Sequence, residues 1–273
     1  MDFGSKEGTG IMVTTDVQGS TPAPRLTGRF QLIHGGRTDA GRDTRQDATA
    51  TERPTLFSPS RKTGRPEHPV CAIVGGIGLA AKLDLLARLV ARVDVLALGG
   101  GIANSFLAAT GTDMGASLCD HDLIDQARRI LDKAKACGCE LMLPVDAVVA
   151  SDVRAGAEDR VIACAAIGPE DMVLDIGPAT VARLTACIET ARTVVWTGPL
   201  GVYRIAPFDG GTNALAWFIA RRTRDAGLRS VAAGEDTIAA LAAAGVEERF
   251  SELTTADALP AWLDGDVPHA LPA

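Results

Sequence analysis

Short apolar runs that end in glycine, each followed by a helical pattern, recur along this chain from about residue 70. The runs with this pattern are Val70–Val74, Val95–Leu98, Val173–Ile176, Thr193–Trp196 and Arg229–Ala233. Each has the length and composition of a buried strand. Repeated β-α units predict an α/β fold with a doubly wound, mostly parallel sheet and helices on both faces, a Rossmann-like three-layer arrangement. A further strand is expected at 140–143 and an edge segment at 146–150.

The first 69 residues differ from this pattern. They are rich in Gly, Thr, Arg, Asp, Ser and Pro, and their one apolar stretch, residues 30–33, is too short to seed a core. Such a composition does not offset chain entropy by burial. We therefore expect residues 1–69 to be a disordered or poorly ordered leader, either a solvated tail or a docking arm, and residues 70–273 to form the folded domain.

The composition excludes several classes of protein. A net charge of −7 argues against nucleic acid or an anionic membrane as the partner. There is no apolar run of about 18 residues and no pattern of a secretory signal, so we expect a cytoplasmic protein without a membrane-spanning helix. The six cysteines are expected to be small buried thiols in a reducing compartment. The scattered histidines form no metal-binding pattern.

The glycines sit where the strands of a parallel sheet end, and open α/β sheets bind ligands at that edge. Glycine lets the backbone approach a ligand closely, and the helix that follows aims free N–H groups at the same spot. Both features suit a phosphate group. The sequence has neither a Walker A loop nor a complete GxGxxG pattern, so the turns predict a phosphate-containing ligand without specifying which one.

Two charged positions near these turns have two interpretations each. Lys82 follows Gly78 by one helical turn, where its ammonium could reach back to a phosphate or could simply be a surface charge. Asp236 opens the last predicted helix behind a glycine, where it could cap the helix or bind a Mg²⁺ ion that bridges phosphates. The spacing alone leaves both alternatives open.

The order of six segments resembles the C-terminal half of the phosphoglycerate kinase family. From about Pro66 onward these segments are AIVGG with a lysine after it, LGGGIANSFL, LPVDAVVASD, MVLDIGPAT, VVWTGPLGVY and SVAAGEDTIAAL. The family transfers a phosphoryl group between ATP and 3-phosphoglycerate in glycolysis, using two Rossmann-like domains that close on a hinge. The resemblance implies that this chain is the nucleotide-binding half, with ATP or ADP and Mg²⁺ as its ligands.

The resemblance also implies which residues contact the nucleotide. Those positions are Lys82, Gly100, Gly101, Gly177, Gly198, Pro199, Tyr203, Asp236 and Thr237. By resemblance, Lys82 and Thr237 contact phosphates and Asp236 is linked to Mg²⁺ through the nucleotide. The glycines, with Pro199 and Tyr203, surround the base and ribose.

Several positions depart from the family pattern. Gly78 stands where the family has the lysine that meets the migrating phosphoryl group, Arg204 replaces a ribose-binding glutamate, and Glu235 replaces a glycine beside the phosphates. The 3-phosphoglycerate-binding domain is not found in residues 1–69. Phosphoryl transfer depends on positioning and charge neutralisation, so we expect negligible turnover from this chain alone.

Two alternatives to an active kinase follow from these departures. The chain could be a catalytically inactive pseudoenzyme that serves as a nucleotide-binding or protein-interaction module. It could also depend on a separate partner chain that supplies the missing domain. Either alternative predicts an exposed apolar surface where the lost domain would pack.

Overall fold

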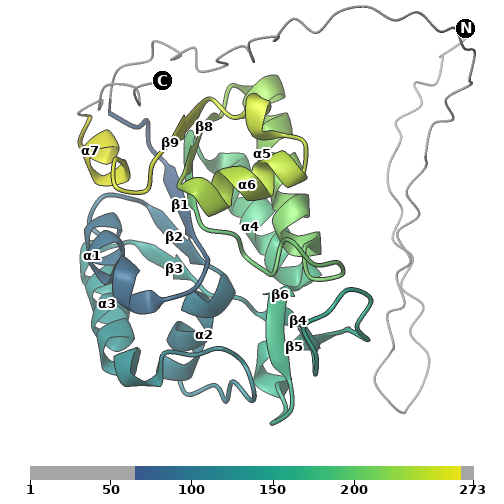
Figure 1. The fold of residues 1–273 in the computed structure, drawn as a ribbon. Coiled ribbons are helices and arrows are strands. Elements are labelled where there is room, and N and C mark those ends of the chain that lie inside the picture. The colour runs from purple at the N-terminus through teal and green to yellow at the C-terminus, as the bar shows by residue number, and fades with distance from the viewer. Residues whose placement is uncertain (1–64, 266–273) are drawn as a thin grey trace, which may run out of the picture. The chain divides into compact units, whose positions relative to one another are not determined.

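The computed structural model describes residues 65–265, and its centre is a six-stranded parallel sheet with the order β3-β2-β1-β7-β8-β9 (Figure 1). The strands are β1 (Val70–Val74), β2 (Val95–Leu98), β3 (Glu140–Met142), β7 (Thr193–Thr197), β8 (Arg229–Ala233) and β9 (Glu252–Thr254). The chain builds outward from β1 in one direction and then from β7 in the other. The strand order therefore reverses between β1 and β7, and the predicted doubly wound fold is confirmed.

Helices cover both faces of the parallel sheet (Figure 1). One face carries α1 (Leu79–Leu89), α2 (Gly100–Ala109), α3 (Ile124–Cys137) and α7 (Leu259–Asp264). The other face carries α4 (Pro178–Thr190), α5 (Gly210–Ala226) and α6 (Glu235–Ala243). Within residues 65–265 the short 3₁₀ turns are η1 (His121–Leu123), η2 (Cys164–Ala166) and η3 (Glu247–Arg249).

The residues of β1 show why an unbroken apolar run is needed in this sheet. Val70, Ala72 and Val74 belong to the core under α1, α2, α3 and α7, whereas Cys71 and Ile73 belong to the core under α4, α5 and α6. Successive side chains of a strand point to opposite faces, so a strand covered on both faces has no position that faces solvent.

A second, smaller sheet corrects two predictions about the strands. It is antiparallel, with the order β5-β4-β6, and consists of β4 (Asp146–Ala150), β5 (Arg160–Ala163) and β6 (Met172–Ile176). The predicted edge segment is thus a central strand, and the run at 173–176 lies outside the parallel sheet. The apolar pattern reports that a strand is buried, but its pairing partner depends on segments far away in the chain.

Residues 65–69, the last part of the predicted leader, are attached to the domain. The backbone N–H of Arg192 donates to the carbonyl of Pro69 at 2.9 Å, and the Thr193 hydroxyl donates to the carbonyl of Glu67 at 2.8 Å. The remainder of the predicted leader, residues 1–64, lies outside the described residues. Across 65–265, none of the helices combines the length and the apolar character that a bilayer span requires.

Candidate functional site

The turns after β1 and β7 meet at the point where the strand order reverses. The N–H of Gly75 donates to the carbonyl of Thr197 at 2.8 Å, and the N–H of Gly76 donates to the carbonyl of Pro199 at 2.7 Å. A Cβ added to Gly75 or Gly198 would collide with the backbone of the opposite turn. These glycines are therefore required by the close approach of the two turns, at the edge where open α/β sheets bind ligands.

Lys82 of α1 lies over this junction. Its Nζ donates to the carbonyl of Gly75 at 2.8 Å and would be 2.9 Å from a Cβ added to Gly198. Burial lowers the pKa of Lys82, while the negative charge of Asp236 acts to raise it. The structure thus brings Lys82 and Asp236, which are far apart in the sequence, to the same rim of the sheet.

The first turn of α6 forms the other side of this rim. Gly234 precedes it in the left-handed region with φ 92°, and Glu235 and Asp236 are exposed. Thr237 is buried, and its hydroxyl accepts from the N–H of Gly198 at 2.6 Å and donates to the carbonyl of Ala233 at 2.7 Å. The Thr237 hydroxyl therefore holds the β7 turn against β8, a structural function that its spacing did not indicate.

Carboxylates from distant segments cap three other helices at this end of the domain. Asp120 accepts from the N–H of the first residue of α1 at 2.8 Å, and Asp175 accepts from the second residue of α5 at 2.6 Å. Asp146 accepts from the second and third residues of α4 at 2.9 and 2.7 Å. These carboxylates occupy one first-turn N–H group of α1, one of α5 and two of α4, so those N–H groups are not free as expected. Among the described residues, no side chain caps the first turn of α6 in this way.

Gly177, an expected wall of the base pocket, is explained by one of these caps. A Cβ added to Gly177 would collide with the carboxylate of Asp146, and one added to Gly201 would collide with that of Asp175. Asp175 is 1% exposed, and burial raises its pKa to about 7, against the effect of the N–H groups that it accepts. The two buried carboxylates and the two glycines therefore join the small sheet to the parallel one.

An exposed apolar pair flanks the turn after β2. A Cβ added to Gly101 would lie 3.3 Å from Cδ2 of Leu118 and 3.4 Å from Cγ2 of Ile77. Ile77 is 71% exposed and Leu118 is 60% exposed. Gly100 has φ 59°, and a Cβ there would be 2.7 Å from the carbonyl oxygen of Gly76, so this turn also needs glycine. A large apolar residue inside the turn Gly76-Ile77-Gly78 was the signal that could have revealed this surface.

The remaining expected positions lie in the turn after β7. Pro199 is buried at the junction with Gly76, while Tyr203 is half-buried farther along the turn. The Nε of Arg204 donates to the hydroxyl oxygen of Tyr203 at 2.7 Å, and the guanidinium lies 5.1 Å from the centre of the ring. Arg204 thus contacts the expected ribose-side residue Tyr203.

Gly78 has φ 78°, and nothing lies within 4 Å of an added Cβ. The position therefore has room for a side chain, but a residue other than glycine would have a strained backbone there. Within residues 65–265 there is no group of three side chains able to hold a metal ion by themselves. Asp236 could contribute one carboxylate to a Mg²⁺ ion whose other ligands are phosphate oxygens and water.

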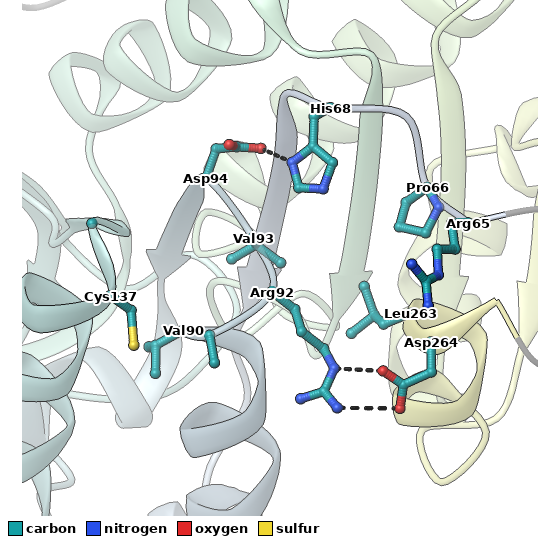
Figure 2. Close-up of a pocket in the computed structure, with 12 residues that line it drawn as sticks. Arg65, Pro66, His68, Val90, Arg92, Val93, Asp94, Cys137, Leu263 and Asp264 are labelled. Carbon is teal, nitrogen blue, oxygen red and sulfur yellow. Dashed lines mark hydrogen bonds and ion pairs between the residues drawn. The ribbon is translucent and has the colours of Figure 1, made fainter.

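A cavity of about 540 Å³ lies at the opposite, amino ends of the strands (Figure 2). Two ion pairs line it: the Nε of Arg92 is 2.6 Å from Oδ1 of Asp264, and Nδ1 of His68 is 2.6 Å from Oδ2 of Asp94. The glycine turns do not contribute to it. We therefore place the candidate site at the carboxyl rim, where Lys82 and Asp236 converge.

Comparison with known proteins gives the same family throughout. The phosphoglycerate kinase of Xanthobacter autotrophicus is 51% identical over 201 residues, which are 73% of this chain and 51% of the relative. That of Rhodospirillum centenum is 50% identical over 202 residues, 74% of this chain and 51% of the relative. The chain spans about half the length of the curated relatives it matches.

Solved structures agree with these relatives. Phosphoglycerate kinase from Coxiella burnetii has a TM-score of 0.70 at 38% identity, over 76% of this chain and 52% of that protein. The phosphoglycerate kinase from Pyrococcus horikoshii shares the fold. Its TM-score is 0.61 at 23% identity, over 77% of this chain and 52% of that protein. The family model described as phosphoglycerate kinase matches residues 56–266. This chain therefore belongs to the phosphoglycerate kinase family.

Proposed function

We propose that this chain binds a Mg²⁺-nucleotide, ADP or ATP, by its phosphates at the rim formed by β1, β7 and the first turn of α6. One observation carries the proposal: the half-buried ammonium of Lys82 lies over the joined glycine turns, within the electrostatic reach of Asp236. A cation and a carboxylate beside an uncapped helix N-terminus provide for both the phosphates and the metal ion.

Each part of the rim has a distinct function in this proposal. Lys82 and the N–H groups at the start of α6 face the negative phosphate oxygens. Asp236 contributes one oxygen ligand to Mg²⁺. The apolar side chains of Ile77 and Leu118, on either side of Gly101, provide a surface on which a nucleobase can lie. Membership of a kinase family that uses ATP and ADP supports this choice of ligand.

Isothermal titration calorimetry of the full chain with Mg-ADP and with Mg-ATP tests the proposal. We expect saturable binding that weakens at least about tenfold in Lys82→Ala, a loss of about 1.4 kcal/mol, because a charge-assisted contact to phosphate is removed. Lys133→Ala is the matched control, since Lys133 also donates to a backbone carbonyl, that of Ala87 at 2.6 Å, but lies on α3.

The titration has two outcomes that contradict the proposal. One is the absence of saturable heat for the unaltered chain with either nucleotide. The other is an equal loss of affinity in Lys82→Ala and Lys133→Ala, which would show that the ammonium of Lys82 has no particular role. Circular dichroism of both variants establishes that they are folded.

A second candidate function is that of a module that binds a separate chain carrying the other half of the enzyme. The exposed pair Ile77 and Leu118 favours it, because an apolar surface at the ligand rim suits a second domain closing over it. A coupled assay with ATP and 3-phosphoglycerate, in the presence of the separately expressed N-terminal half of the Xanthobacter autotrophicus relative, tests this. Turnover that does not exceed the sum of the separate chains contradicts it.

A further inference from the structure

The cavity at the amino ends of the strands contains none of the residues of the nucleotide rim. Its volume of about 540 Å³ is in the range of pockets that hold small molecules. Segments far apart in the sequence build its wall: the chain before β1, the end of α1, the start of β2, the end of α3 and α7 (Figure 2). The fold thus holds these segments around a second candidate ligand site.

The end of the cavity at α7 gathers three arginines around one carboxylate. Asp264 accepts from Nε and Nη2 of Arg92, at 2.6 and 3.2 Å. Arg65 lines the same cavity, and its Cγ would be 2.9 Å from a Cβ added to Gly265, the residue after Asp264. Arg88 lies one helical turn before Arg92, whose Nη1 donates to the carbonyl of Arg88 at 3.5 Å.

Two of these guanidinium groups have no partner of their own. Within residues 65–265, neither Arg65 nor Arg88 makes a hydrogen bond or an ion pair through its side chain. The hydrogen bond from Arg92 holds the pKa of Asp264 below its usual value, and the positive charges of Arg92, Arg65 and Arg88 act in the same direction. The three arginines therefore carry two positive charges that this carboxylate does not balance.

The rest of the wall is apolar or already hydrogen-bonded. Val90 and Leu263 are buried apolar residues that line the cavity. Oδ2 of Asp94 lies 2.6 Å from Nδ1 of His68 and accepts from the N–H of Val70 at 2.6 Å. The second carboxylate of the cavity thus has donors of its own, and the arginine end is the part that attracts an anion.

We propose that this cavity binds a small organic phosphate monoester, whose phosphate contacts Arg65 and Arg88 and whose carbon skeleton lies against Val90 and Leu263. The planar guanidinium matches the oxygens of a phosphate in two-point hydrogen bonding. A phosphate monoester carries close to two negative charges at neutral pH, which equals the unbalanced positive charge of the arginines.

The test is a titration of the ¹⁵N-labelled full chain with phenyl phosphate, followed by NMR. We expect saturable shifts of the backbone N–H signals of residues 88–94 and 263–265, which become smaller at high salt. Phenol should cause no saturable shift there, and inorganic phosphate should bind more weakly than phenyl phosphate. Nucleotide binding at the rim is read from residues 75–82 and 234–237 instead, so the two proposals fail separately.

Variants locate the anion within the cavity. Arg65→Ala and Arg88→Ala should each weaken the binding of phenyl phosphate at least about fivefold, because each removes a charge-assisted contact. Asp264→Asn should bind phenyl phosphate at least about twofold more tightly, because its carboxylate no longer repels the phosphate or competes for Arg92. Arg183→Ala is the matched control, since Arg183 is also an exposed arginine but lies on α4, on the other face of the sheet.

The unaltered chain alone can overturn the proposal, so the test does not depend on whether a variant folds. The absence of saturable shifts in residues 88–94 and 263–265 would contradict it, and equal affinity for inorganic phosphate would contradict an organic ligand. Among folded variants, an equal loss in Arg65→Ala and Arg183→Ala, or weaker binding in Asp264→Asn, would also overturn it.

Discussion

Single residues decide how much of the family's phosphate chemistry this rim retains. Lys82 keeps an ammonium over the glycine turns, but Gly78 offers no second one. Asp120 places a carboxylate on the first N–H of α1, where a phosphate would otherwise be attracted. Among the described residues, Lys82 is the ammonium that lies over these turns, so we expect the rim to be better suited to nucleotide binding than to phosphoryl transfer.

Gly78→Lys should restore an ammonium to the rim. We expect tighter binding of Mg-ATP, most clearly at low salt, because the side chain enters open space beside the proposed phosphate site. The left-handed backbone should make the variant less stable by about 1–2 kcal/mol. Calorimetry and urea unfolding measure the two effects. Gly138→Lys is the control, since it has φ 73° and open space but lies at the end of α3; it should lose stability without binding more tightly.

Asp175 should make stability depend on pH. Its pKa is about 7 in the folded chain and about 4 when unfolded, so between these values the folded state holds more protons. The free energy of unfolding should then fall as pH rises from 4 to 7, by at most about 1.4 kcal/mol per pH unit.

Urea unfolding of the unaltered chain and Asp175→Asn across this range isolates the contribution of Asp175. The slope attributed to Asp175 should disappear in the variant. A difference between the two proteins that does not change with pH would mean that the N–H groups of α5 keep the carboxylate ionised throughout.

At the scale of elements, carboxylate caps explain how the helices are anchored around the rim. Asp146 of β4 accepts from two N–H groups of the first turn of α4. The Thr180 hydroxyl also donates to the Asp146 carboxylate, at 2.6 Å. This carboxylate therefore links the small sheet to α4, which packs on the large sheet. Because the carboxylate is buried, each of its oxygens needs a hydrogen-bond donor.

Asp146→Ala should cost about 2–4 kcal/mol in the free energy of unfolding, because it leaves two N–H groups and the Thr180 hydroxyl with fewer partners. Urea denaturation measures this. Asp125→Ala removes an exposed carboxylate that pairs with Arg128 in the first turn of α3, and should cost less than about 0.5 kcal/mol. Similar losses in the free energy of unfolding would show that the buried cap stabilises the fold no more than an exposed ion pair does.

At the scale of the whole molecule, the chain matches about half the length of its relatives. Efficient phosphoryl transfer needs both substrates held in line and charge neutralised at the transferred group. Because Gly78 carries no ammonium, less positive charge would be available to neutralise the transferred group.

The chain alone should therefore show no phosphoglycerate kinase turnover above background in a coupled assay with ATP and 3-phosphoglycerate. Losing one preorganised donor typically lowers the rate by roughly 10²–10³. Here Gly78 replaces the family's lysine and Glu235 replaces a glycine beside the phosphates, so two such losses combine. The Xanthobacter autotrophicus relative at equal concentration is the positive control. Turnover of comparable size from this chain would contradict the expectation.

Most strand positions and the α/β class could be predicted because they depend on local patterns. Apolar runs such as Val70–Val74 and the glycines after them are visible within a few residues of sequence. The resemblance then singled out Lys82 and Asp236, which the fold brings to one rim. The partners of Thr237 and Gly177 were not predictable, because they come from segments about 30 or more residues away.

The amino-acid sequence by itself determined the doubly wound fold and the family. The apolar runs, the glycines that follow them and the order of the motifs can all be read along the chain without knowing its contacts. Only the tertiary structure decided that β4 and β6 form a separate antiparallel sheet, that Asp120, Asp146 and Asp175 cap helices, and that Ile77 lies beside Leu118. These features are contacts between distant segments, and such contacts are set by how the layers pack, which no local pattern contains.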